Sequence, residues 1–162
     1  MAILTVDALH RRQCACPLGG VQLCRIRERN TCLTVAMKKI SFTDKAPAPM
    51  GAYSQAVLAG NTLYTSGQIA INPVTGTLVL DNIEAETKQV MENMKAVLEA
   101  AEMTFDNVVK TTIFIMDMND FGKINAVYGS YLNEKNAPAR ETVQVAGLPK
   151  NVNVEISMIA VK

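Results

Sequence analysis

Residues 136–162 read NAPARETVQVAGLPKNVNVEISMIAVK, and this stretch gives the strongest indication of how the chain is organised. The pattern predicts a strand over Glu141–Ala146, a turn over Gly147–Asn151 and a second strand over Val152–Val161. Arg140 lies where the first strand begins, and Glu155 lies inside the second. On paired strands these two side chains could face the same small ligand.

Arg140 is the only arginine after Arg29, and it stands among ten lysines from Met37 onward. A guanidinium offers a planar fork of donors that a lysine ammonium does not have, so this position favours recognition of a planar anion. The alternative is an arginine at a strand end that pairs with a surface carboxylate. Residue type alone leaves both interpretations open.

Composition excludes several classes of protein. A chain of 162 residues is expected to form one domain whose core needs no disulfides. The formal net charge is +1, with no long basic run for nucleic acid and no apolar stretch long enough for a membrane. From Met37 to Lys162 there is no His, Cys or Trp. This region therefore cannot supply a Cys nucleophile, a His base or a His/Cys zinc site.

Residues 1–36 differ from the rest, because they hold all four cysteines, the only histidine and five arginines against two acidic residues. The spacing C-x-C-x7-C-x7-C matches no familiar zinc pattern, so free thiols are expected. The arginine-rich composition resembles a transit peptide, although serine is absent. Because Met37 resembles a start of translation, we expect a disordered extension over 1–36 and one domain over 37–162.

The first half of that domain is predicted to form strands. Lys38–Thr43 reads as a short edge strand, and Tyr53–Ala59 and Thr62–Ser66 flank the hairpin signal Gly60-Asn61. A glycine at position 67, at the end of the second of these strands, would allow a ligand or another backbone to come close.

An apolar stripe at 4-3-1-3-3-1-3 spacing then predicts a helix from Ile83 to Ala101, capped by Asp81 or Asn82. Asn107–Met116 carries Val, Ile and Phe on both faces, which is typical of a strand buried on both sides. The helices can cover one side, and we expect a second subunit to cover the other.

A second helix is predicted from Phe121 to about Lys135, capped by Asn119 or Asp120. Asn125 lies on its apolar stripe, where a side-chain amide needs a partner. That partner is either a hydrogen-bonding group in the core or a ligand. Two hairpins that bracket the helices predict an α+β fold, a mixed sheet with two helices packed on one face.

Five segments carry a resemblance to a known family: GAYSQ (Gly51–Gln55), TSGQI (Thr65–Ile69), NDFGKINAVY (Asn119–Tyr128), PAR (Pro138–Arg140) and LPKNVNVEI (Leu148–Ile156). Through them the chain from Lys39 to Lys162 resembles the RidA (YjgF) family of reactive intermediate deaminases. The resemblance implies a chorismate-mutase-like fold and a homotrimer with sites in clefts between subunits. It also implies cytoplasmic hydrolysis of 2-iminobutanoate and 2-iminopropanoate to 2-keto acids and ammonia, without a cofactor or metal.

The resemblance also implies roles for individual residues. Arg140 would bind the substrate carboxylate, and Glu155 would hold and activate water. The pocket would be lined by Tyr53, Ser66, Gly67 and Asn125. Many family members have a cysteine two residues after the arginine, where this chain has Thr142. A thiol is therefore not essential to the chemistry here, and Thr142 is kept as a candidate ligand contact.

The chemistry agrees with the composition. A protonated imine is already electrophilic, so a carboxylate that moves protons through water would suffice. The alternative for Glu155 is a solvated glutamate on a polar strand face with Asn153 and Ser157.

Two other functions stay open for the protein. One is a regulator that binds a 2-keto acid at Arg140 without turnover, and the other is a ribonuclease or chaperone-like role. The net charge of −2 after residue 36, from 11 basic and 13 acidic residues, disfavours nucleic-acid binding.

Overall fold

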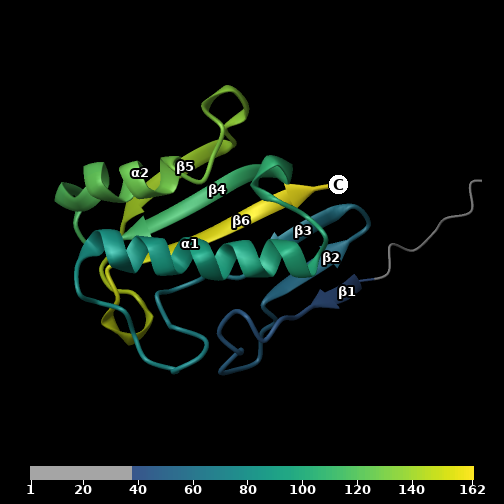
Figure 1. Ribbon diagram of the computed structural model, residues 1–162, viewed down its shortest axis with the longest axis horizontal. Helices are drawn as coiled ribbons and strands as arrows, with labels where there is room; N and C mark the ends of the chain where they lie inside the picture. Colours follow the sequence, from purple (N-terminus) through teal and green to yellow (C-terminus); the bar gives the residue numbers. More distant parts are fainter. Residues whose placement is uncertain (1–37) are drawn as a thin grey trace, which may run out of the picture. The chain divides into compact units, whose positions relative to one another are not determined.

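The computed structural model describes residues 38–162, so the expected extension over 1–36 lies outside the described range. Six strands and two α-helices follow one another in this part of the chain (Figure 1). They are β1 (Lys38–Ser41), β2 (Ala56–Ala59), β3 (Thr62–Thr65), α1 (Ile83–Ala100), β4 (Val108–Ile115), α2 (Phe121–Gly129), β5 (Ala139–Gln144) and β6 (Val154–Val161). The strands form one mixed sheet in the order β1-β2-β3-β6-β4-β5.

The first predicted hairpin is confirmed and the second is wrong. β2 and β3 pair antiparallel around Gly60, whose φ of 62° suits a glycine in a tight turn. β5 and β6 do not pair, because β4 lies between them, parallel to β5 and antiparallel to β6. The segment between β5 and β6 is therefore a crossing connection and not a hairpin turn. Its short helical turn, Pro149–Asn151, produced the misleading local signal.

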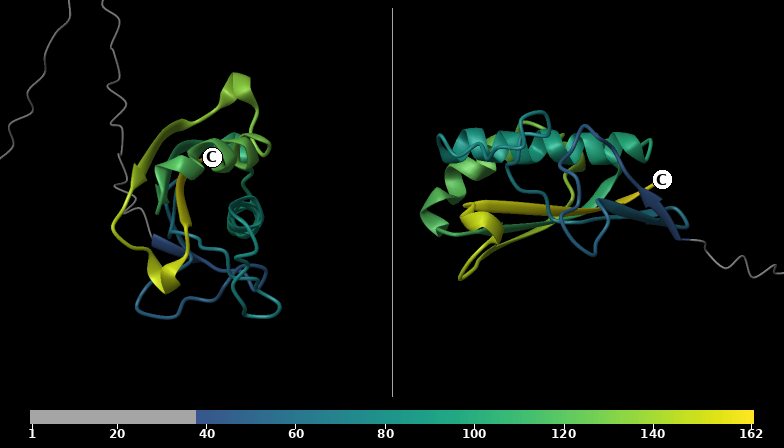
Figure 2. Two further views of the ribbon diagram at one scale, coloured as in Figure 1. Left: turned by 90° about the vertical axis from the view of Figure 1, so that its left-hand side faces the viewer. Right: turned by 90° about the horizontal axis from the view of Figure 1, so that it is seen from below.

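Both helices pack on the same face of the sheet, as predicted (Figure 2). Burial alternates along β6, where every second residue from Val154 to Ala160 is buried. The apolar stripe of α1, which includes Met91, Met94 and Leu98, closes over these side chains. Every second residue of the strands therefore packs against the apolar stripe of the helix, and one core lies between the sheet and the helix layer.

The other face of the sheet has no layer of its own among residues 38–162. Tyr64 on β3 is 49% exposed there, and Phe114 on β4 is half-buried. β4 is therefore buried on one side only within a single chain, whereas its sequence predicted burial on both sides. The expected cover from a second subunit stays a prediction.

The helix ends refine the predicted boundaries. Asn82 caps α1, because its side-chain oxygen accepts a hydrogen bond from the backbone N–H of Ala85 at 2.8 Å. Asp120 precedes α2 but its side chain makes no capping bond. The helix ends at Gly129 and not near Lys135, because the chain tightens there into shorter turns.

No helix within residues 38–162 is long and apolar enough to cross a bilayer.

Candidate functional site

Arg140 is the second residue of β5 and lies against α2. In the sheet register it is opposite Thr111, which is buried under the helices. Its Nη1 donates a hydrogen bond to Asn125 Oδ1 at 2.5 Å. Its Cζ lies 5.5 Å from the ring centroid of Phe121 and 5.4 Å from that of Tyr128. One amide and two aromatic faces therefore hold the guanidinium.

The periodicity of α2 explains this arrangement. Phe121, Asn125 and Tyr128 are spaced at i, i+4 and i+7, so one face of the helix presents all three to β5. Tyr128 is itself fixed, because its hydroxyl donates a hydrogen bond to Thr111 Oγ1 at 3.1 Å. Attraction between a guanidinium and an aromatic face further stabilises this position of the Arg140 side chain.

Arg140 retains free donors. A guanidinium has five N–H groups, and Asn125 accepts from Nη1 only. Among residues 38–162 no carboxylate lies within ion-pair distance of Arg140, so the alternative of a surface salt bridge finds no partner here. The side chain is exposed. It can therefore present a pair of N–H groups to a carboxylate from solution.

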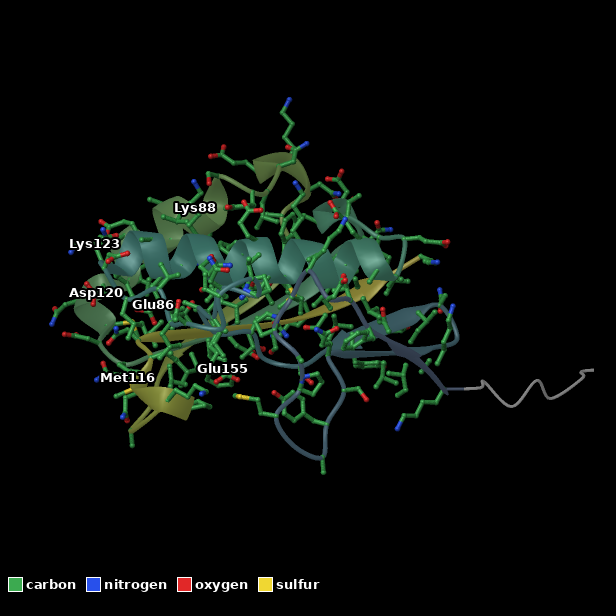
Figure 3. The ribbon with its side chains drawn as sticks, turned by 60° about the horizontal axis from the view of Figure 1, so that its bottom comes forward. Glu86, Lys88, Met116, Asp120, Lys123 and Glu155 are labelled. Atoms are coloured by element: carbon green, nitrogen blue, oxygen red, sulfur yellow. The ribbon has the colours of Figure 1, made fainter. Side chains whose placement is uncertain are left out.

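Glu155 is the second residue of β6 and faces the side of the sheet away from the helices. Its neighbours Val154 and Ile156 are buried under the helices, while Glu155 is half-buried beside Phe114. Figure 3 shows Glu155 beneath the sheet, on the side opposite α1. Burial raises the pKa of the Glu155 carboxyl above its ordinary value. Among the described residues no side chain or backbone group donates a hydrogen bond to it.

The Glu155 carboxylate lies directly over Gly67. A Cβ on residue 67 would overlap Glu155 Oε1 and would lie 2.7 Å from its Cδ. The sequence predicted a close approach at this glycine, and the approaching group is the glutamate side chain. Gln68 exchanges two backbone hydrogen bonds with Ile156, at 2.8 and 3.1 Å. This bridge fixes Gly67 beside Glu155.

The other candidate residues are placed as follows. The Ser66 hydroxyl donates to the Ser54 carbonyl at 2.6 Å, so it can meet a ligand only as an acceptor. Tyr53 is half-exposed, and its hydroxyl accepts a hydrogen bond from the Met50 N–H at 3.3 Å. Thr142 shares the helix-facing side of β5 with Arg140. Its Oγ1 is buried and has no hydrogen-bond partner within residues 38–162.

Within one chain the site does not come together as the sequence suggested. Arg140 and Glu155 are two strands apart and three residues apart in register. At ordinary strand spacing and rise their Cα atoms lie roughly 14 Å apart. They also face opposite sides of the sheet. The expectation that they meet across paired strands is therefore wrong for a single chain. Asn125, which was open between core and ligand contact, contacts Arg140.

Sequence reasoning missed one buried acidic residue, Glu86 on α1. It is 1% exposed and accepts hydrogen bonds from the start of β6. Its position three residues after Ile83 and four before Val90 was the available signal, because that spacing falls on the buried stripe. In the part of the chain that the structure describes, no group of three His, Cys, Asp or Glu side chains could hold a metal ion.

Comparisons with known proteins agree with this fold. A family model described as Endoribonuclease L-PSP matches residues 43–162. A RutC family protein of Pyrococcus horikoshii is 51% identical over 126 residues, which make up 78% of this chain and 99% of that protein. The 2-iminobutanoate/2-iminopropanoate deaminase of Rattus norvegicus is 48% identical over 126 residues, which make up 78% of this chain and 91% of that protein.

A solved structure gives the same result. The crystal structure of the YjgF gene product of Escherichia coli is 46% identical and superimposes with a TM-score of 0.72. The match covers 76% of this chain and 98% of that one. It confirms the predicted α+β architecture of a mixed sheet with two helices on one face. By sequence and by fold, this chain belongs to the Endoribonuclease L-PSP family, the RidA (YjgF) family that its motifs resemble.

Proposed function

We propose that this protein hydrolyses reactive 2-imino acids, such as 2-iminobutanoate and 2-iminopropanoate, to 2-keto acids and ammonia. The observation that carries the proposal is the Glu155 carboxylate. It is half-buried, has a raised pKa and accepts no hydrogen bond within residues 38–162. A carboxylate in that state is suited to exchange protons with water. The name of the rat relative, at 48% identity, points to the same reaction.

The assembly we propose is a homotrimer with each site between two copies. Arg140 and Glu155 face opposite sides of one sheet, so a small ligand can touch both only if they come from different copies. The uncovered face that holds Glu155 carries aromatic side chains, including Phe114 and Tyr64. Uncovered apolar surface of this kind favours association. Closed rings of identical subunits satisfy such a surface without leaving a free end.

In the reaction the substrate carboxylate binds the free N–H groups of Arg140. Glu155 takes a proton from a water molecule as the oxygen attacks the imine carbon, which gives a tetrahedral carbinolamine. Because the attacked imine is protonated, this carbinolamine is neutral, and Glu155 then returns its proton to the nitrogen. As the C–N bond breaks, the hydroxyl proton passes to Glu155 and the carbonyl of the 2-keto acid forms. Glu155 gives this proton to the released ammonia, so the sum is protonated imine plus water to ketone plus ammonium. The raised pKa of Glu155 makes this carboxylate a stronger base than a solvated one.

The remaining candidates take supporting roles in the proposal. Tyr53, Ser66, Gly67 and Thr142 line the pocket, with the Ser66 hydroxyl as an acceptor because its proton is given to Ser54. Asn125 acts through Arg140, since its side-chain oxygen holds one guanidinium nitrogen.

The test couples this protein to threonine dehydratase, which releases 2-iminobutanoate from threonine. Release of 2-ketobutanoate is followed with wild type, with Glu155→Gln and without protein, so that spontaneous hydrolysis is subtracted. Acceleration by wild type and its loss in the variant support the proposal. If wild type binds 2-ketobutanoate but does not accelerate its release from the imine, the protein is a 2-keto acid sensor and not an enzyme.

A further inference from the structure

Glu86 is a buried acidic side chain that the proposed reaction does not use. It lies in the first turn of α1 and is 1% exposed. Its Oε1 accepts from the backbone N–H of Asn153 at 2.6 Å and from that of Val154 at 3.2 Å. Its Oε2 accepts from Asn153 Nδ2 at 2.9 Å. Two of these donors belong to Asn153, the residue before β6, and the third belongs to Val154, its first residue.

The segment that these bonds hold is strained where it enters β6. Lys150 and Asn151 both have positive φ, 57° and 55°, which non-glycine residues seldom adopt. Such a conformation persists only where the surroundings hold it in place. Glu86 supplies contacts immediately after these residues, and the Met116 N–H donates to the Asn153 carbonyl at 3.0 Å. Asn153 is therefore held both by α1, through Glu86, and by Met116, the residue that follows β4.

Glu155 comes one residue after Val154, the last residue that Glu86 contacts. Its side chain must lie over Gly67 on the far side of the sheet, where there is no room for a Cβ on residue 67. Figure 3 shows Glu86 on the α1 side near the start of β6 and Glu155 beneath the sheet. Rotation or fraying at the start of β6 would move the Glu155 carboxylate first, because it lies next to the strand end.

We propose that Glu86 is a positioning residue, which anchors the start of β6 to α1 and so holds Glu155 over Gly67. The inference rests on the proposed function, in which Glu155 handles the proton of the attacking water. Glu86 touches no substrate in this account. A contribution to folding alone would lower stability but would leave the chemistry of the folded protein unchanged, and this difference can be measured.

The experiment is a double-variant cycle on the full chain. Glu86→Ala is made in wild type and in Glu155→Gln, and the kcat for imine hydrolysis is measured above the spontaneous rate. The matched control is Glu84→Ala, which removes an exposed acid from the same turn of α1. 2-Ketobutanoate binding and the native mass are measured for every variant to show that the Arg140 subsite and the assembly persist.

Glu86→Ala should lower kcat at least about tenfold in wild type, because small displacements of a reacting group are costly. It should leave 2-ketobutanoate affinity within about threefold and have almost no effect in Glu155→Gln, since residues that act as a unit are not additive. Glu86→Gln keeps an oxygen for the two backbone donors and should restore most of the rate. Glu84→Ala should match wild type.

Equal losses of kcat from Glu86→Ala in both backgrounds would overturn the inference while leaving the role of Glu155 intact. Full turnover by Glu155→Gln would instead overturn the proposed function and the inference with it. If Glu86→Ala fails to fold, Asn153→Ala replaces it, because this exposed residue loses one bond to Oε2 and keeps the backbone. Its smaller loss of kcat should also vanish in Glu155→Gln, and persistence there would refute the inference.

Discussion

Replacing Gly67 with alanine should displace the Glu155 carboxylate and lower turnover without unfolding the protein. The new Cβ would overlap Oε1 and would lie 2.7 Å from Cδ and 2.9 Å from Cγ of Glu155. Ordinary contact between such atoms needs about 3.5 Å, so the side chain has to move by roughly 1 Å. A misplacement of about 1 Å at a reacting group can cost about a hundredfold in rate.

The fold should tolerate this change, because the colliding atoms belong to the flexible end of a side chain and not to backbone. We expect the free energy of unfolding to change by less than about 1 kcal/mol. The assay compares kcat for imine hydrolysis, 2-ketobutanoate affinity and the melting temperature with those of Gly147→Ala, where an added Cβ meets nothing within 4 Å. Wild-type kcat in a folded Gly67→Ala protein would refute the claim that Glu155 has to lie where it does.

Three further predictions concern the charged residues and the extension. Arg140→Lys should lose about 1.5–3 kcal/mol of charge-assisted hydrogen bonding, roughly ten- to a hundredfold in kcat/KM, and wild-type affinity for 2-ketobutanoate would contradict this. Burial raises the pKa of Glu155 in the folded state, so its ionised form destabilises the fold above that pKa and the cost disappears at low pH. Glu155→Gln should therefore raise the melting temperature near pH 7 but not below about pH 4, whereas a gain that is equal at both pH values would argue against desolvation. A chain that starts at Met37 keeps every proposed site residue and should retain the number of subunits per oligomer and the specific activity of the full chain; aggregation would show that residues 1–36 belong to the fold.

Local patterns predicted the elements whose signals are local. The stripe of α1 needs one buried face every turn, and it located the helix to within one residue of its end. The Gly60-Asn61 turn located the first hairpin, because a tight turn is also specified by neighbouring residues. The insertion of β4 between β5 and β6 could not be predicted this way. Strand order depends on packing between residues distant in sequence, and the turn before β6 resembled a hairpin.

The candidate site was predicted in part. Arg140 and Glu155 were chosen as candidates and remain predictions, but the wrong strand pairing placed them together, whereas β4 separates them. The two aromatic faces around Arg140 were not predicted, because Phe121 and Tyr128 fit the apolar stripe of the second helix. Glu86 was missed because an acidic residue on a helix is ordinarily solvated. Its burial is explained by the three donors that it meets there, two backbone N–H groups and Asn153 Nδ2.

The most direct test of the central claim mixes subunits of two variants that are each strongly impaired. Glu155→Gln keeps Arg140, and Arg140→Lys keeps Glu155, so a site built from two different copies can again contain both groups. Random assembly of equal amounts should restore about a quarter of the wild-type sites, because each site needs one particular variant at each of its two positions. The variants are co-refolded, mixed oligomers are verified by native mass, and imine hydrolysis is measured against each variant alone. Recovery near that level would support a site shared between copies. Mixed oligomers whose activity does not exceed the average of the two separate variants would contradict it.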